Sequence, residues 1–148
     1  MNDTAPVIVW FRRDLRVHDH PALHDALRDG APVVPLFVLD PTILDGRFAS
    51  PNRAWWLRGS LEALDGELRA RGASLLVRQG RPADVVPAVA RETGATRVVA
   101  SRDYTPFGRA RDRAVAERLA ADDVPFHAKR GVLVHEPEDV LNGEGGPY

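Results

Sequence analysis

The sequence predicts a doubly wound α/β domain, in which helices cover both faces of a five-stranded parallel sheet. Short runs rich in valine, leucine and isoleucine alternate with longer segments whose apolar residues recur at helical spacing. Most of the short runs are apolar at nearly every position, which is typical of strands that are covered on both faces. The links are short, so right-handed crossovers would place successive strands parallel in one sheet.

Five segments have the length and composition of strands, and turn-forming or polar residues flank them. In chain order they are Pro6–Phe11, Pro32–Asp40, Ser74–Gln79, Thr96–Ser101 and Pro125–Arg130.

Four segments with helical spacing lie between successive strands. They are Pro21–Arg28, Pro51–Arg71, Pro82–Arg91 and Pro106–Ala121. Each begins with proline, which suits the first position of a helix. We expect Asp19 to cap the first helix and Ser50 to cap the second.

The second helix carries the clearest apolar stripe. Leu57, Leu61, Leu64 and Leu68 recur at i, i+4, i+7 and i+11, so they share one face, and Gly72 is a stop signal for the helix. This face should pack on the sheet.

Length and composition indicate one ordinary globular domain, residues 1–148, with 44% hydrophobic and 28% charged residues. The net charge of −1 gives no overall attraction to nucleic acid or membrane surfaces. Cysteine is absent, which excludes disulfides, thiolate metal sites and a cysteine nucleophile. The start "MNDTAP" does not resemble a signal peptide, and no apolar run is long enough to span a bilayer. These features predict a cytoplasmic location.

Several familiar site motifs are missing. The first strand is not followed by G-x-G-x-x-G, and the chain contains neither a P-loop nor a G-x-S-x-G elbow. His18, His20 and His24 cluster around the start of the first helix, but no H-E-x-x-H accompanies them. We therefore expect surface or capping histidines, no metal site and no catalytic residue in this chain.

The three tryptophans have different expected places. Trp10 should belong to the core of the first strand. Trp55 and Trp56 are neighbours on a helix and point about 100° apart, so at most one can face the core squarely. We expect core or boundary packing for this pair, with a pocket wall as the alternative.

Ligands of open α/β sheets bind beyond the carboxyl ends of the strands, where the strand order reverses. For the common order 3-2-1-4-5, the loops at that point are Arg12–Arg16 and Ser101–Gly108, and the loop from Leu39 to Arg53 forms a side wall. Charged residues after a strand are usually a solvated turn. Asp103, in the loop expected to face Arg12–Arg16, favours a binding site instead.

Five stretches resemble the N-terminal α/β domain of the DNA photolyase and cryptochrome family. The most specific is "WFRRDLR" followed by "VHDHPAL", from Trp10 to Leu23. The others cover essentially the rest of the chain, in order: "PLFVLDP" (Pro35–Pro41), "LVRQGRPADVVP" (Leu76–Pro87), "RDYTPFGRARDRAV" (Arg102–Val115) and "NGEGGPY" (Asn142–Tyr148).

The resemblance implies a Rossmann-like domain that holds an antenna chromophore. In this family a second, helical domain carries FAD, the cavity for the pyrimidine dimer and a tryptophan electron relay, so Trp10, Trp55 and Trp56 are not that relay. The chain would then be part of a deoxyribodipyrimidine photo-lyase, a carbon–carbon lyase that repairs DNA in light. It would have no activity alone, whether as a natural truncation or as an isolated domain. Its partners would be the FAD domain and, through that domain, damaged DNA, with no membrane.

The resemblance also bears on which chromophore is bound. Folate-binding members carry an Asn-Glu pair where this chain has Phe107 and Gly108, and a histidine near the position of Arg47. Both differences favour a deazaflavin or flavin over a folate. The pocket would be lined by the residues that match the family's pattern, namely Asp14, Val38, Ala49, Arg53, Asp103 and Gly108.

These residue types suit a tricyclic ring. Such a ring needs an apolar slot with a few fixed polar groups, and Val38 and Ala49 are small enough to leave one. Asp103 could accept a hydrogen bond from the ring or its side chain, and Arg12 or Arg53 could pair with an anionic ring. A cryptochrome, which is a light-signalling receptor with the same domain, remains an alternative, as does a stand-alone nucleotide-binding or interaction module.

Overall fold

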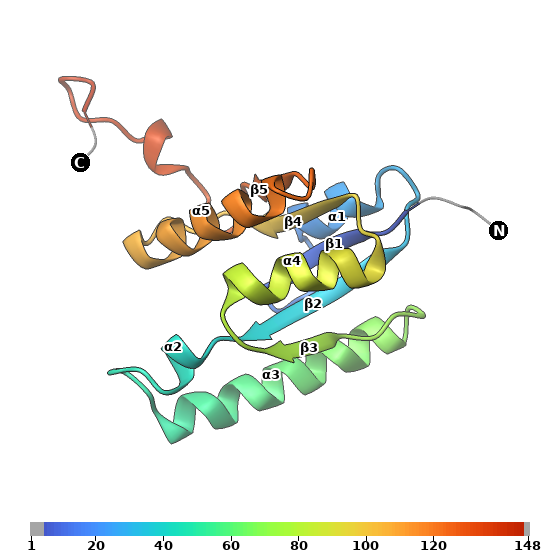
Figure 1. Cartoon of the computed structure of the whole chain (residues 1–148). Helices are drawn as coiled ribbons and strands as arrows, with labels where there is room; N and C mark the ends of the chain where they lie inside the picture. Colours follow the sequence, from blue (N-terminus) through green and yellow to red (C-terminus); the bar gives the residue numbers. More distant parts are fainter. Residues whose placement is uncertain (1–4, 147–148) are drawn as a thin grey trace.

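A computed structural model describes residues 5–146 as a three-layer α/β domain. Its five strands are all parallel and lie in the order β3-β2-β1-β4-β5. They are β1 (Val7–Phe11), β2 (Val33–Leu39), β3 (Leu76–Gln79), β4 (Arg97–Ser101) and β5 (Phe126–Lys129). The strand order reverses between β1 and β4, as the sequence predicts (Figure 1).

The helices connect successive strands in the predicted order. They are α1 (Pro21–Leu27), α2 (Pro41–Leu44), α3 (Pro51–Arg69), α4 (Pro82–Thr93) and α5 (Pro106–Ala120), and a short 3-10 turn, η1 (Pro137–Asp139), follows β5. Every one of these elements has proline in its first turn. Only α2 and η1 were not predicted from the sequence.

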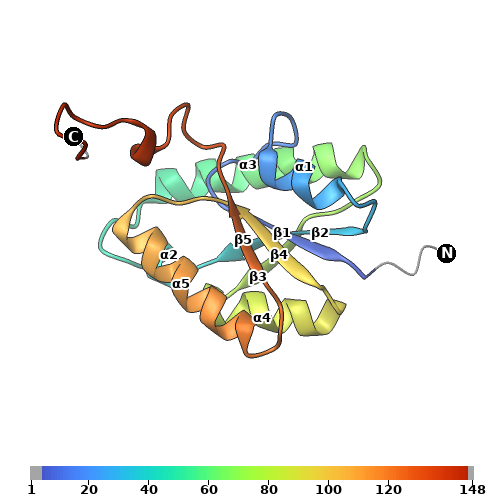
Figure 2. The same ribbon diagram turned by 90° about the horizontal axis from the view of Figure 1, so that it is seen from above.

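Each face of the sheet has its own core. On one face α1 and α3 contribute Ala22, Ala26, Leu64 and Leu68, while on the other α4 and α5 contribute residues such as Val86 and Leu119. Figure 2 shows the two helix pairs on opposite sides of the strands. The strand β1 is buried along its whole length, which explains its uninterrupted apolar sequence.

The predicted cap of the first helix is wrong. His20, rather than Asp19, caps α1, because its Nδ1 accepts the backbone N–H of Leu23 at 3.1 Å. Asp19 instead has a positive φ of 47° in the turn before the cap. Ser50 occupies the cap position of α3 as predicted, but its side chain makes no capping hydrogen bond.

The three tryptophans differ more in solvent exposure than the sequence predicts. Trp10 is buried in β1, but Trp55 and Trp56 are 73% and 72% exposed. The prediction of core or boundary packing for this pair is therefore wrong. The face of α3 that meets the sheet is supplied by its leucines, and both indole rings lie outside it.

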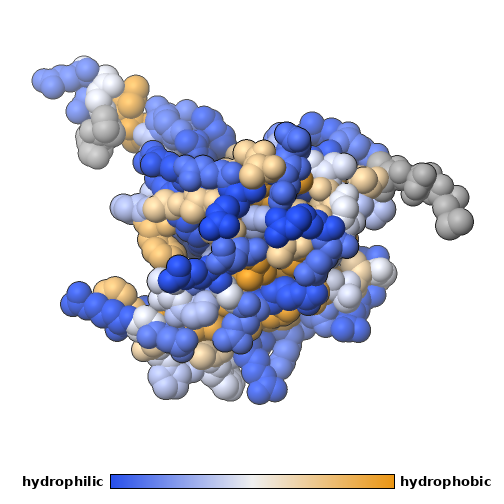
Figure 3. Space-filling model, viewed as in Figure 1, coloured by the Kyte–Doolittle hydropathy of each residue, from blue (hydrophilic) through white to orange (hydrophobic). Residues whose placement is uncertain are grey.

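The segment that follows β5 leaves the body of the domain (Figure 1). The family resemblance predicts that Val132–Tyr148 is partly extended and leaves apolar residues uncovered. Of its described part only η1 is helical, and Val134 is 96% exposed. Figure 3 shows hydrophobic residues among hydrophilic ones on this projection. Residues 147 and 148 lie outside the described residues.

One side chain anchors this segment to the domain. Glu136 is buried, and its carboxylate accepts a hydrogen bond from the hydroxyl of Tyr104 and pairs with Arg102 at 3.2 Å. Burial and the bond to Glu136 raise the pKa of Tyr104 to about 12. The loop after β4 therefore holds the chain that follows β5.

Between residues 5 and 146, no helix is long and apolar enough to cross a membrane. The same residues contain no group of three or more histidine and acidic side chains that could hold a metal ion.

Candidate functional site

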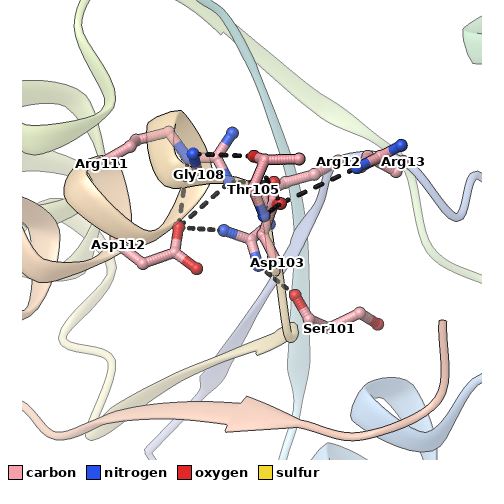
Figure 4. A network of polar contacts seen from close by, with 8 residues as sticks. All are labelled: Arg12, Arg13, Ser101, Asp103, Thr105, Gly108, Arg111 and Asp112. Atoms are coloured by element: carbon pink, nitrogen blue, oxygen red, sulfur yellow. Dashed lines mark hydrogen bonds and ion pairs between the residues drawn. The ribbon is translucent and has the colours of Figure 1, made fainter. Parts of the chain in front are cut away.

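The two loops predicted to face each other at the carboxyl edge of the sheet are joined by a polar network. The guanidinium of Arg12, after β1, donates to the backbone oxygen of Ser101, at the end of β4, and to the carboxylate of Asp112 on α5. Figure 4 shows these side chains gathered between the two strand ends and the start of α5. The Arg12 side chain is only 6% exposed, so this ion pair is largely removed from water.

Asp103 organises the start of α5. One of its oxygens, Oδ1, accepts hydrogen bonds from the backbone N–H and the hydroxyl of Thr105, at 3.0 and 2.9 Å. Its other oxygen, Oδ2, lies 3.1 Å from Arg111. Burial opposes ionisation of Asp103, but the bonds from Thr105 and the charge of Arg111 outweigh it and hold its pKa below the ordinary value.

Gly108 is required by this arrangement. A Cβ at residue 108 would overlap the carboxyl group of Asp103, because the first turn of α5 lies directly against it. The hydroxyl of Thr105, which caps the helix, also accepts the backbone N–H of Gly108 at 3.0 Å. The glycine therefore leaves space for Asp103.

Asp14 is bound on the other side of the network. It is buried, accepts a hydrogen bond from the Ser101 hydroxyl, and its Oδ2 lies 2.9 Å from Nε2 of His20. Because Nδ1 of His20 accepts a backbone N–H, the neutral ring carries its proton on Nε2, facing Asp14. Burial by itself would raise the pKa of Asp14. The hydrogen bonds to its carboxylate lower the pKa by more than burial raises it, so the pKa lies below its ordinary value.

An open cavity lies beside this network, not within it. It has a volume of about 530 Å³ and lies among the segment after β2, the start of α3 and the start of α5. Its lining is mostly apolar or small, and consists of Thr42, Ile43, Leu44, Gly46, Arg47, Phe48, Ala49, Ser50, Arg53, Ala54, Leu57 and Phe107. We call this space the apolar cavity.

The six predicted site residues therefore fall into two groups. Ala49 and Arg53 line the apolar cavity. Asp14 and Asp103 are bound in the network, Gly108 packs against Asp103, and Val38 lies in the sheet core. The structure thus places the segment after β2, expected to be a side wall, as the main lining of the cavity.

Several residues of this region were not identified from the sequence. Arg111 and Asp112 complete the ion pairs, because Asp112 pairs with Arg12 and Arg111 pairs with Asp103. Ile43 and Phe48 are apolar residues in a segment predicted to be a loop, and they are 54% and 74% exposed. Such residues in a predicted loop are the signal that could have located the cavity.

The five-stranded parallel sheet, with its reversal between β1 and β4, defines a Rossmann-like α/β domain, and the apolar cavity lies at the carboxyl edge of this sheet. Residues 7–148 match the family described as DNA photolyase. The chain belongs to this family.

Individual relatives agree with the assignment. A deoxyribodipyrimidine photo-lyase of Agrobacterium fabrum is 39% identical in an alignment that covers 98% of this chain and 30% of that protein. Cryptochrome-2 of Arabidopsis thaliana is 38% identical over 95% of this chain and 23% of its own length.

The fold is also shared with solved structures. A crystal structure of an archaeal photolyase from Sulfolobus tokodaii superposes with a TM-score of 0.86. Its description names two FAD molecules and the implication of a novel light-harvesting cofactor. It is 30% identical, and the match covers 93% of this chain and 32% of that one. The chain thus spans between about a quarter and a third of the length of these three proteins.

Proposed function

We propose that this chain is the light-harvesting domain of a deoxyribodipyrimidine photo-lyase and that it binds a deazaflavin or flavin antenna chromophore. The observation that carries the proposal is the apolar cavity at the carboxyl edge of the sheet, in a chain of the photolyase family. Its volume of about 530 Å³ is in the range of pockets that hold small organic ligands.

The cavity suits a planar aromatic ring. Ile43, Leu44 and Phe107 provide apolar walls, Ala49 and Ala54 leave space between them, and the guanidinium of Arg53 supplies a fixed charge at the edge. An antenna transfers excitation to a second chromophore without making or breaking bonds. The chain's part is then to bind the ring, orient it and keep water from it.

The proposed partner is a helical domain that carries FAD and contacts damaged DNA. Support comes from the relatives, of which this chain matches about 30% in length, and from the Sulfolobus structure, whose description names two FAD molecules. The proposal assigns one chromophore to this domain and the FAD of DNA repair to the other.

A cryptochrome-type photoreceptor is the second candidate. It is favoured by the 38% identity to a plant cryptochrome over nearly the whole chain. Since the chain resembles both classes over nearly its whole length, a chromophore in the apolar cavity is compatible with either candidate. A stand-alone nucleotide-binding or interaction module is the third candidate.

Titration of the purified chain with a deazaflavin and with a flavin, followed by ligand fluorescence anisotropy, tests the proposal. We expect saturable binding of at least one of them. Ala54→Trp should abolish it by filling the apolar cavity, whereas Ala70→Trp, beyond the last turn of the same helix, should bind like the wild type. Absence of binding in the wild type, or equal binding by both variants, would contradict the proposal.

A further inference from the structure

The outer face of α3 exposes two large aromatic side chains. The helix has 19 residues and lies along the outside of the domain (Figure 1), and its leucines face the sheet. Trp55, on the opposite face, is 73% exposed, and Trp56 beside it is 72% exposed. Tryptophan is among the residues that contribute most to protein–protein interfaces. An exposed pair of tryptophans on a regular helix is therefore typical of a surface that binds a partner.

The residues opposite the leucines recur with the spacing of a coiled-coil seam. Steps of three and four residues alternate from residue 52 to residue 69, so six positions form one stripe along the helix. All six are exposed, and they are Asn52, Trp55, Gly59, Glu62, Gly66 and Arg69. We call this stripe the outer seam. A seam of this spacing can pack along a second helix.

Two glycines leave room for a partner in the outer seam. Gly59 and Gly66 lie within α3, although glycine is a poor helix former. A Cβ at either residue would meet nothing within 4 Å, so packing inside the domain does not require a glycine there. A large side chain of a neighbouring molecule can approach the helix backbone closely at both positions.

An antiparallel second copy of α3 fits this pattern of large and small residues. Consider two α3 helices that run antiparallel about a two-fold axis between residues 60 and 61. Trp55 then lies opposite Gly66 of the second copy, and Glu62 lies opposite Gly59. Each large side chain meets a glycine, and the two-fold axis forms every such contact twice.

The charges of α3 favour the same arrangement. Arg58 and Asp65 lie seven residues apart on one flank of the outer seam. In an antiparallel pair these flanks face each other, so Arg58 of each copy lies near Asp65 of the other. A parallel pair would instead place Glu62 against Glu62 and Arg69 against Arg69, and like charges repel.

We propose that two copies of this chain associate through α3, antiparallel about a two-fold axis, with Trp55 of each copy packed on Gly66 of the other. None of the six residues of the outer seam lines the apolar cavity, so the proposed dimer does not depend on an antenna ligand. One helix from each copy makes a small interface, so the association should be weak and should increase with protein concentration.

Sedimentation velocity of the purified chain over a range of concentrations tests the dimer. We expect a monomer when dilute and a growing dimer fraction toward about 1 mM. Trp55→Ala should raise the dissociation constant about tenfold or more. Phe48→Ala is the control, because Phe48 is an equally exposed ring, at 74%, outside α3, and it should leave the dissociation constant unchanged. A chain that stays monomeric at about 1 mM, or an equal loss in both variants, would overturn the proposal.

Cysteine cross-linking tests the direction of the two helices, and the chain has no cysteine of its own to interfere. Asn52→Cys and Arg69→Cys change exposed residues that lie opposite each other in the antiparallel pair. A mixture of the two variants should form a disulfide-linked dimer under mild oxidation. Neither variant alone should do so, because its two cysteines would lie about 25 Å apart along the helices, at 1.5 Å per residue.

The cross-linking results have clear alternatives. Linked dimers of Asn52→Cys alone would show a parallel pair and overturn the proposed arrangement. Arg113→Cys, at an exposed residue of α5, is the control for random collisions. If Asn52→Cys links to Arg113→Cys as readily as to Arg69→Cys, no defined interface exists and the proposal is wrong. Failure of these experiments would leave the proposed antenna function standing, because that function depends on the apolar cavity.

Discussion

The polar network and the apolar cavity lie at the same edge of the sheet but are built in opposite ways. In the network, Arg12, Asp14 and Asp103 are each bound by two or more partners and largely buried. In the cavity, Phe48, Ala49 and Arg53 are exposed, and the space they border is open.

This difference indicates that the two regions have different roles, one in stability and the other in binding. Side chains whose polar groups are already bonded hold the loops after β1 and β4 in place, and they have little capacity left for a ligand. Side chains around an open apolar space gain contacts when a ligand enters. Substitutions in the network should therefore change mainly stability, and substitutions in the cavity mainly binding.

The largest expected effect comes from breaking the network's ion pair. Asp112→Asn leaves the buried guanidinium of Arg12 without its charged partner, and such a loss costs about 3 kcal/mol in the free energy of unfolding. Glu62→Gln breaks the exposed pair with Arg58 and should have a much smaller effect, because water screens that pair. Chemical denaturation at pH 7 measures both, and two equally small changes would show that the network is not structural.

A methyl group added at residue 108 should have the next largest effect. Gly108→Ala forces a Cβ into the Asp103 carboxyl group, and overpacking of this kind costs about 1–3 kcal/mol. Gly66→Ala in α3 is the control, because a Cβ there meets nothing within 4 Å and alanine is the better helix former. The midpoint temperature of thermal unfolding should fall for Gly108→Ala and rise for Gly66→Ala. Unchanged stability of Gly108→Ala would mean that Asp103 moves freely.

Acid should weaken the network next. The folded-state pKa values of Asp14 and Asp103 lie below the ordinary value of 3.8, so their contribution to stability is present above that pH. It is lost as the pH falls through the lower folded-state values. The free energy of unfolding of the wild type should therefore fall below about pH 4. In Asp14→Asn the free energy of unfolding should fall less steeply with decreasing pH. Asp45→Asn, which changes an exposed aspartate, should show the same pH dependence as the wild type. Parallel curves for all three proteins would contradict this prediction.

The smallest effect on stability is expected in the cavity. Ala54→Trp should change the free energy of unfolding by less than about 0.5 kcal/mol, because Ala54 is exposed and packs in neither core. Denaturation curves measure this change. The same variant should abolish ligand binding, so stability and binding separate in one protein. A large loss of stability would show that the cavity walls belong to the core.

The fold could be predicted almost completely from the sequence. All five strands and the four long helices lie where composition, apolar spacing and proline indicated, because each signal is local. The strand order was also predicted correctly from a general preference of such sheets. The element α2 was missed, because a four-residue helix capped by Asp40 has too few residues to show a periodic pattern.

The predicted site residues stay predictions, and the structure places them in two different regions. The resemblance named Ala49 and Arg53, which line the apolar cavity, but also Asp14, Asp103 and Gly108, which the structure shows in the network. For Asp14 and Asp103, charge and position in the sequence do not distinguish a carboxylate that binds a ligand from one that is bonded to its neighbours. That distinction depends on partners far away in the chain, such as Ser101 for Asp14, 87 residues apart.

The sequence by itself determined the α/β class, the order of the elements, the buried first strand and the membership of a specific family, since all of these follow from short patterns along the chain. Only the tertiary structure decided which charges neutralise one another and where space is left open. Arg12 meets Asp112 across 100 residues, and Phe107 on α5 lines the apolar cavity together with side chains from the segment after β2. Burial and electrostatic pairing are set by distances in space, and these do not exist until the chain has folded.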